Sequence, residues 1–237
     1  KMNKKSYQLA SEVITISSVM KKVIARNIDE DKIKVIYPWV DTSFIKPLKK
    51  SENWFVKKHG LTDKKVILYS GNMGLTHDLM TLMETAKELQ KIENSFHFLF
   101  IGGGTQKESL QDFKEKHNLI NVSFLPYQDP EVLPFSFASA DFGIVSLGIG
   151  AEGLSVPSKT FYLLAAGSAI ISISEKGSEI QRLIEENNCG LSIETKRVKE
   201  ITDFLINTNN EKLNTFKINS RKLSQKFTVE NAKQFLK

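Results

Sequence analysis

A helix with an apolar body and a polar start is the first candidate for chemistry. Residues 156–173 read VPSKTFYLLAAGSAIISI, and the stretch from Thr160 to Ala166 is almost wholly apolar, which predicts a buried helix. If Ser158 caps this helix, four features favour an anion at its start. They are the free backbone N–H groups, the helix dipole, the Ser158 hydroxyl and the Lys159 ammonium. A phosphate group is the natural ligand. The alternative is an ordinary cap beside a lysine that faces solvent.

A glycine-rich loop, GNMGLTH at 71–77, is the second candidate. Gly71 and Gly74 free the backbone for close approach to a ligand, and the helix that follows offers unpaired N–H groups to an anion. Asn72 can donate one more hydrogen bond. His77 could add positive charge, but its reference pKa of about 6.5 makes it a weak cation near neutral pH. The alternative is a plain tight turn.

A second glycine loop, GGGT at 102–105, does not match the dinucleotide fingerprint. G-x-G-x-x-G would need glycine at position 107, which is Lys107, and no acidic residue ends a strand about 20 residues later. A structural turn is therefore the better interpretation, and the failed fingerprint counts against a dehydrogenase.

Two further loops could recognise a ligand. In PYQD at 126–129, Tyr127 offers a face for a stacked base, and Gln128 offers hydrogen bonds to its edge, although an ordinary surface turn is equally compatible. In LGIGAEGLSVPS at 147–158, Glu152 is the only charge in a flexible, unusually long connection, which makes it a candidate for binding hydroxyls. The alternative there is a mobile surface acid.

The elements that must position these loops alternate between strand and helix. The strands are rich in Val, Ile, Leu and Phe without strict alternation, which is typical of strands buried on both faces in a doubly wound parallel sheet. They are predicted at 64–70, 96–102, 121–126, 141–147, 168–174 and 189–193, with helices at 78–91, 106–118, 130–140 and 178–188. The fold class is α/β. In such sheets the ligand lies beyond the carboxyl ends of the strands, where all the loops above belong.

The remaining chain divides into smaller parts. A strand at 11–16, a helix at 17–27 capped by Ser17 or Ser18, and a strand at 32–38 precede a proline-bounded linker. A helix then begins with Ser51 as its cap and stops at Gly60. We expect a remnant of another domain at 1–37, a linker at 38–47, the main domain at 48–222 and a C-terminal helix at 223–237. The chain is expected to be a fragment, because it enters structure almost at once.

Composition and charge narrow the function classes. The 237 residues are 41% hydrophobic and 25% charged with a single cysteine, as in ordinary globular proteins of a reducing compartment. Residues 1–60 hold 13 Lys and Arg against 6 Asp and Glu, whereas residues 61–237 hold 20 against 21. The basic end suggests an anionic neighbour such as membrane headgroups, the alternative being a solvated lysine-rich face. No zinc-finger spacing or RNA-binding signature supports nucleic acid as a partner.

Taken together, these segments resemble the retaining GT-B glycosyltransferases of the group 1 or family 4 type, which build bacterial capsule, O-antigen and exopolysaccharide sugars. SEVITISSVMKKVI and KIKVIYPWVDTSFIKP look like the crossing from the first to the second domain of that family. LYSGNMG, FLFIGGG, VSFLPY, ADFGIVSL, PSKTFYLLAAGSAIIS and EIQRLIEENNCGL look like its donor-binding second domain, in order. The resemblance covers essentially the whole chain.

The resemblance implies a UDP-sugar or another nucleoside diphosphate sugar as donor, and no metal or cofactor. It implies that Gly71, Asn72, Met73, Gly74 and His77 approach the diphosphate with Ser158 and Lys159, that Pro126, Tyr127 and Gln128 hold the base, and that Glu152, Gly153, Leu154 and Ser155 meet the sugar. It also implies a hexosyl or N-acetylhexosaminyl transferase whose lipid-linked or polysaccharide acceptor is bound by the first domain. The location would be the cytoplasm, with peripheral association at the inner face of the membrane.

The chain departs from the family pattern at four positions. Asn72 and His77 stand where many members have Arg and Lys, and Leu154 and Tyr162 stand where many carry two glutamates. Glu152, the candidate catalytic residue, substitutes for the first glutamate only if its loop shifts by two residues. Tyr162 is kept among the candidate donor-binding residues. Two alternatives therefore stay open. One is a non-catalytic nucleotide-sugar-binding module of the same fold, and the other is an unrelated doubly wound nucleotide-binding protein.

Overall fold

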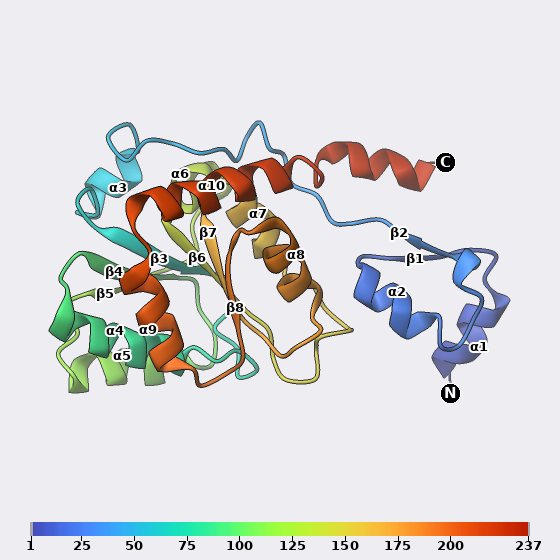
Figure 1. Cartoon of the computed structure of the whole chain (residues 1–237), viewed down its shortest axis with the longest axis horizontal. Coiled ribbons are helices and arrows are strands. Elements are labelled where there is room, and N and C mark those ends of the chain that lie inside the picture. The colour runs from blue at the N-terminus through green and yellow to red at the C-terminus, as the bar shows by residue number, and fades with distance from the viewer. Residues whose placement is uncertain (1, 237) are drawn as a thin grey trace.

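The computed structural model describes residues 2–236 and contains a six-stranded parallel sheet. Its spatial order is β5-β4-β3-β6-β7-β8 (Figure 1). The strands are β3 (Lys65–Ser70), β4 (Phe96–Ile101), β5 (Val122–Leu125), β6 (Phe142–Ser146), β7 (Ala169–Ile173) and β8 (Gly190–Ile193). All six lie within the strands that the sequence predicts, so the doubly wound α/β sheet is confirmed.

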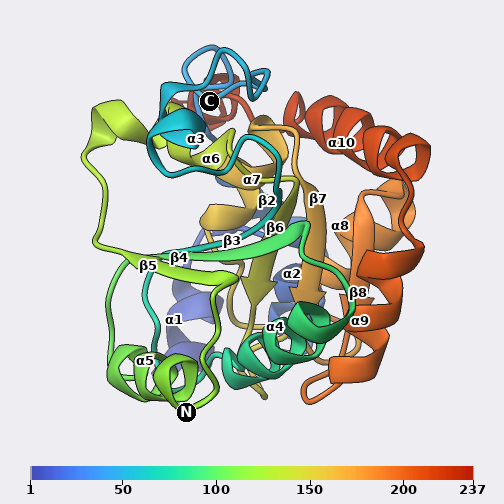
Figure 2. The same cartoon turned by 90° about the vertical axis from the view of Figure 1, so that its left-hand side faces the viewer.

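Helices cover both faces of this sheet (Figure 2). The elements that follow or separate its strands are α3 (Trp54–Lys58), α4 (Met80–Ile92), α5 (Lys107–Lys116), η2 (Pro130–Val132), α6 (Leu133–Phe137), α7 (Lys159–Ala165), α8 (Glu179–Asn187), α9 (Val198–Asn207), α10 (Asn210–Ser224) and η3 (Val229–Leu236). Alternate side chains of the central strands enter two separate cores; Leu68, for example, joins the α7 side and Ile67 the α4 side. Burial on both faces explains why the strands are continuously apolar.

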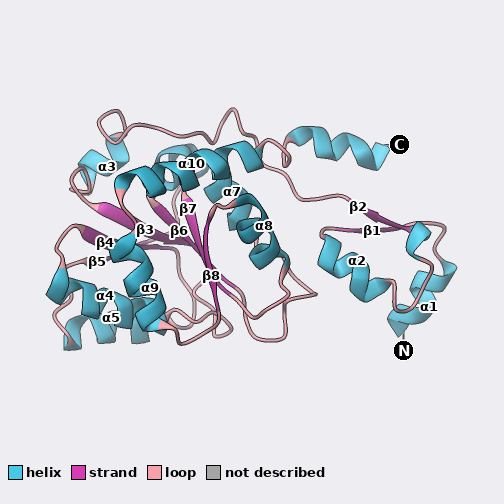
Figure 3. Cartoon of the chain, in the orientation of Figure 1, coloured by secondary structure: helices cyan, strands magenta, loops and turns pink. Residues whose placement is uncertain are grey.

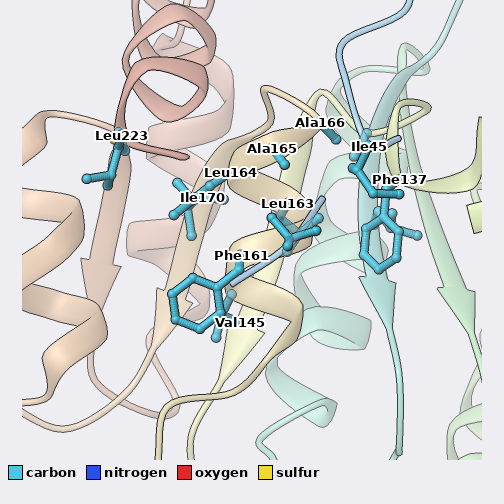
Figure 4. Close-up of a cluster of buried hydrophobic side chains, with 14 of the residues drawn as sticks. Ile45, Phe137, Val145, Phe161, Leu163, Leu164, Ala165, Ala166, Ile170 and Leu223 are labelled. Carbon is cyan, nitrogen blue, oxygen red and sulfur yellow. The ribbon is translucent and has the colours of Figure 1, made fainter. Parts of the chain in front are cut away.

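The helix predicted around residues 160–166 is α7, and it forms the centre of one core. Figure 4 shows Phe161, Leu163 and Leu164 of α7 packed among side chains from the strands and from α10. Five of the seven residues of α7 are buried. The helix therefore offers only its first residues and Tyr162 to a ligand.

The strand order reverses between β3 and β6, which are hydrogen-bonded neighbours although two other strands lie between them in sequence. Chains leaving these two strands turn away to opposite sides, which opens a crevice at their carboxyl ends. The loops after β3 and β6 are 71–77 and 147–158, so the topology places both candidate loops at this point.

A smaller unit precedes the sheet (Figures 1 and 3). It comprises α1 (Met2–Leu9), β1 (Val13–Thr15), α2 (Ser18–Ile24), η1 (Glu30–Lys32) and β2 (Ile33–Val35), with β1 and β2 paired in parallel. Ser17 caps α2 by accepting a hydrogen bond from the Met20 N–H at 3.0 Å, as predicted. The fully buried Glu179 of α8 accepts the Val19 N–H at 2.9 Å and so ties α2 to the larger unit.

The segments at the predicted domain boundaries pack more closely than their sequence suggests. Residues 38–47 hold no helix or strand, but Val40 and Ile45 are buried in the core beside α7. The end of α10 and the turn after it are also core, through Leu223 and Phe227, and the last helix begins only at Val229. The boundaries at 48 and 223 therefore stay predictions, and packing extends across both.

Within residues 2–236, no helix combines the length and hydropathy that a membrane span requires.

One capping prediction is wrong. The cap of α3 is Asn53 and not Ser51, because the Asn53 side chain is fully buried and accepts the N–H groups of Phe55 and Val56. Its amide also donates to the Phe135 carbonyl at 2.8 Å.

We therefore expect Asn53→Ala to lower the free energy of unfolding by about 2 kcal/mol, since a cap and a buried hydrogen bond are lost together. Ser51→Ala is the matched control and should change it by less than about 0.5 kcal/mol. Urea unfolding of both variants measures the difference, and equal losses would contradict the assignment.

Candidate functional site

A cleft of 590 Å³ lies at the carboxyl ends of β3 and β6, where the strand order reverses. Four elements contribute to it: the loop after β3, α6, the loop after β6, and the start of α7. Its lining residues are Ser70, Gly71, Asn72, Thr76, His77, Leu133, Phe137, Leu147, Gly148, Ile149, Ala151, Ser155, Pro157, Ser158, Lys159 and Tyr162. Seven predicted site residues thus meet in one cleft: Gly71, Asn72, His77, Ser155, Ser158, Lys159 and Tyr162.

Lys159 provides the charge of this cleft. Its Nζ is buried, and it has no hydrogen-bond partner among the residues that the structure describes. The ammonium lies 3.7 Å from the centroid of the Tyr69 ring, and a Cβ atom added to Gly71 would lie only 3.1 Å from it. Burial lowers the pKa of Lys159 from 10.5 to about 7. The space beside Gly71, where the sequence predicts the close approach of a ligand, is therefore occupied by the Lys159 side chain.

His77 belongs to a hydrogen-bonded group below the glycine loop. The Tyr69 hydroxyl donates to the Asn72 carbonyl and lies 2.5 Å from His77 Nδ1. Since that hydroxyl has only one proton, the geometry fits an Nδ1–H that donates to Tyr69. Burial, and then the charge of Lys159, lower the pKa of His77 below 6.5. His77 is therefore a still weaker cation than its reference pKa implies.

This lowered pKa can be tested by titration. We expect the His77 imidazole to stay neutral down to below pH 6.5 in the free protein, as measured by NMR of its ring resonances. The lowered folded-state pKa means that the unfolded chain binds the proton more readily, so His77 should reduce stability as the pH falls through 6.5. A titration midpoint above 6.5 would contradict the arrangement with Tyr69 and Lys159.

The 102–105 loop supports the first glycine loop from behind, as its interpretation as a structural turn predicts. Gly102 and Gly104 have φ values of 133° and 137°, and added Cβ atoms would lie 2.2 Å from the Gly71 carbonyl and 2.5 Å from Asn72 Oδ1. Gln106 donates to the carbonyls of Gly74 and His77, which fixes the turn between them. Met73 is fully buried in the core, its N–H donates to the Gly103 carbonyl and its carbonyl accepts the Gln106 N–H, so the structure does not offer Met73 to a ligand.

Tyr127 lies beside the cleft, against the glycine loops. The residue is 61% exposed, and its ring packs on Gly102 and Gly103. Gln128 donates to the Pro126 carbonyl at 2.7 Å and so shapes the same turn. An exposed aromatic face next to a phosphate-sized cationic site is compatible with a stacked base.

An aromatic wall of the cleft was not predicted. Leu133 and Phe137 of α6 line it together with Tyr162, whose ring stacks on Phe137 with centroids 5.2 Å apart and planes at 28°. Apolar residues on a helix are read from sequence as core, and Phe137 is indeed buried. The residue types alone do not show which of these apolar side chains also face the cleft. Ser70, Thr76, Leu147, Gly148, Ile149, Ala151 and Pro157 also line the cleft without having been singled out.

The loop after β6 divides between two hollows. Ser155 lines the cleft, whereas Gly153 and Leu154 line a second hollow of 630 Å³ formed with residues of the N-terminal unit. Glu152 lines neither, and its carboxylate accepts the Gly150 N–H at 2.8 Å. The structure therefore does not bring Glu152 to Lys159.

Ser158 differs from its predicted role. It stands at the cap position of α7 with helical dihedrals, φ −59° and ψ −32°, and its hydroxyl makes no capping hydrogen bond. The side chain is exposed and lines the cleft, so the hydroxyl is free to face a ligand instead of holding the helix. Among the described residues, no cluster of three or more His, Cys, Asp or Glu side chains offers a metal site.

Comparisons with known proteins agree with this geometry. The family model of glycosyl transferases group 1 matches residues 51–223. The probable glycosyltransferase WbjE of Pseudomonas aeruginosa is 26% identical over 185 residues, covering 78% of this chain and 46% of WbjE. The putative colanic acid biosynthesis glycosyl transferase WcaI of Escherichia coli (strain K12) is 28% identical over 176 residues, covering 73% of this chain and 43% of WcaI. The chain thus spans less than half the length of either relative.

A solved structure shows the same fold. The crystal structure of HepE from Anabaena in complex with UDP and glucose superposes with a TM-score of 0.80 at 16% identity, covering 98% of this chain and 63% of HepE. The family match includes the loops that carry Gly71 and Lys159, and the parallel sheet has the fold of a GT-B Rossmann-like half. The chain therefore belongs to the group 1 glycosyl transferases, as the C-terminal domain of a GT-B glycosyltransferase.

Proposed function

We propose that this domain binds a sugar linked to a nucleoside diphosphate, with UDP as the nucleotide, and that the diphosphate lies against Lys159. The observation that carries the proposal is the buried Lys159 ammonium between Gly71 and the Tyr69 ring, without a hydrogen-bond partner among the described residues. A buried cation without a counter-charge is unfavourable, and an anion in the cleft removes that cost. WbjE, WcaI and the UDP complex of HepE support a nucleotide sugar as that anion.

The rest of the donor would extend in two directions from Lys159. The base would stack on Tyr127 with Pro126 and Gln128 at its edge. The sugar would lie toward Ser155 and the loop after β6. Asn72 and the backbone of Gly74 would complete the diphosphate site beside Gly71, whose own N–H donates to the Ile101 carbonyl. His77 would contribute a hydrogen bond rather than a charge.

The chemistry that this arrangement serves is glycosyl transfer. The bond between the anomeric carbon and the β-phosphate oxygen breaks, an acceptor hydroxyl oxygen bonds to that carbon, and the hydroxyl proton is released. Negative charge develops on the departing diphosphate, where a preorganised cation stabilises it most. A hexosyl or N-acetylhexosaminyl group, retention of configuration and a polysaccharide or lipid-linked acceptor are parts of the same proposal.

Binding of the acceptor and of a membrane would involve a two-domain protein that is longer than this chain. In a two-domain transferase the acceptor is held by the other domain, and the basic residues of 1–60 would face an anionic cytoplasmic membrane surface, each contributing about 1 kcal/mol. Co-sedimentation with anionic vesicles that weakens with salt is the expected result. Equal binding to neutral vesicles would favour a solvated lysine-rich face.

A non-catalytic binding module is the second candidate, because Glu152 lies away from the cleft and bonds to Gly150. Sugar transfer by a protein that also contains the preceding domain would exclude it. Binding without any transfer would favour it.

Isothermal titration of this chain tests the donor site. UDP should bind at least tenfold more tightly than uridine, NADH should not compete, and the UDP affinity should be the same with EDTA as with Mg²⁺. Uridine binding as tightly as UDP would contradict a diphosphate site at Lys159.

A further inference from the structure

The loop after β6 forms a large part of the cleft, although part of it lies outside. The segment 147–158 supplies seven of the sixteen described residues that line the cleft. Between Ala151 and Ser155, which both line it, the chain leaves the cleft, and Gly153 and Leu154 line the second hollow together with residues of α2. The shape of this side of the cleft therefore depends in part on what Gly153 packs against.

Gly153 packs against α2 of the N-terminal unit. A Cβ atom added to Gly153 would lie 2.9 Å from Cγ2 of Val23 and 4.0 Å from Cγ1 of Val19, so the backbone of the loop is in contact with α2. The φ of Gly153 is not positive, which means that space, and not backbone conformation, restricts this position. The position of α2 thus limits where this part of the loop can lie.

Glu179 of α8 fixes the start of α2. Its side chain is fully buried, and one carboxylate oxygen accepts the Val19 N–H at 2.9 Å. The other oxygen accepts the Tyr37 hydroxyl at 2.9 Å and the Arg182 guanidinium at 2.5 Å. The hydroxyls of Ser18 and Tyr37 are 2.7 Å apart, which ties α2 into the same network. Movement of α2 away from Glu179 would leave a buried carboxylate oxygen and a backbone N–H without their partners, which is costly.

We propose that Glu179 is a positioning residue for the donor site: by holding α2 through Val19, it keeps Gly153 and the loop after β6 in the shape that the donor requires. Val19 makes both contacts, since its N–H bonds to Glu179 and its Cγ1 lies near Gly153. Glu179 itself does not line the cleft, so it would act only through α2. The donor in this proposal rests on the proposed function, whereas the contacts from Glu179 to the loop do not.

Amide hydrogen exchange of Glu179→Gln tests these contacts on the whole chain. The substitution keeps the shape of the side chain but turns an N–H group toward other donors, so α2 should loosen and exchange within 148–155 should rise at least about threefold. Exchange in α4, which belongs to the other core, should stay at the parent rate. An unchanged rate within 148–155, or an equal rise in α4, would overturn the proposal.

Glu186→Gln is the matched control for this substitution. It removes the other carboxylate partner of Arg182, on the same helix, and leaves the bond between Glu179 and Val19 in place. Exchange within 148–155 should therefore equal that of the parent chain. A rise as large as in Glu179→Gln would contradict a specific role of Glu179.

Gly153 and Val23 test the other end of the arrangement without changing a buried charge. Gly153→Ala places a methyl group against Val23 and should displace the loop, which should weaken binding of UDP-glucose relative to UDP at least about threefold in calorimetric titration. Val23→Ala makes room for that methyl group. The double variant should therefore return the ratio of the two dissociation constants to within about twofold of the parent ratio.

These ratios decide the proposal even if Glu179→Gln does not fold. A parent ratio in Gly153→Ala, or a ratio that Val23→Ala does not restore, would contradict the control of the donor site by α2. Failure of UDP to bind the folded parent chain would refute the proposed function, and the exchange rates would still show whether Glu179 holds the loop.

Discussion

Replacing Lys159 by methionine should weaken the binding of UDP by roughly ten- to hundredfold, because a charge-assisted hydrogen bond in a buried site contributes about 1.5–3 kcal/mol. Methionine keeps the apolar stem of the side chain against Tyr69 and Gly71 and removes only the ammonium. Binding of uridine should hardly change, since it carries no diphosphate. Isothermal titration of both ligands measures the two effects separately.

The substitution should not harm the fold. The ammonium is buried without a hydrogen-bond partner in the described part of the chain, so its removal relieves a desolvation cost. We expect Lys159→Met to be at least as stable as the parent in urea unfolding. His77→Gln is a useful control, because a neutral side chain replaces a neutral imidazole and the loss of UDP affinity should be much smaller. Unchanged UDP affinity in Lys159→Met would remove the central functional assignment.

Adding a methyl group to Gly102 should cost about 3 kcal/mol of stability and lower UDP affinity as well. The φ of 133° is strained for any residue with a Cβ, and that Cβ would lie 2.2 Å from the Gly71 carbonyl oxygen. The clash can be relieved only by moving the backbone of Gly71, which packs directly against Lys159. A fall of roughly 6–12 °C in melting temperature is expected for a chain of this size.

Gly103→Ala is the matched control for this prediction. An added Cβ there would lie 3.6 Å from the Tyr127 ring, in ordinary van der Waals contact, and Gly103 has no positive φ. Its stability should change by less than about 1 kcal/mol. Equal melting temperatures for the two variants would show that the 102–105 loop does not support the 71–77 loop as described.

Much of this fold could be predicted from the sequence, because its strands are buried on both faces and are read as apolar runs. The position of the site followed from topology, since the loops after parallel strands share one edge of the sheet. Gly71 and Lys159 could also be found, as a glycine after a strand and a lysine at the start of an apolar helix. These features are local in the sequence.

The parts that could not be predicted depend on contacts between distant residues. Ser51 and Asn53 are both good caps, and only the burial of Phe55 and the bond to Phe135 select Asn53. The pKa of His77 is lowered by its burial and then by the charge of Lys159, neither of which its own surroundings in the sequence reveal.

The missed cleft residues have a similar cause. Leu133 and Phe137 have the residue types of an ordinary core helix, and their contribution to the cleft depends on α6 lying beside Tyr162 of α7. Glu152 is the opposite case, because a lone acid among glycines attracts attention while its carboxylate bonds within its own loop.

Proton uptake on UDP binding tests the central claim most directly. With a pKa of about 7, Lys159 is largely neutral at pH 8 in the free protein, and an adjacent diphosphate raises its pKa again and makes it take up a proton. Calorimetry of UDP binding at pH 8, in buffers of different ionisation enthalpy, should show an uptake approaching one proton for the parent chain and close to none for Lys159→Met. UDP binding without proton uptake by the parent, or with the same uptake by Lys159→Met, would contradict a diphosphate site at Lys159.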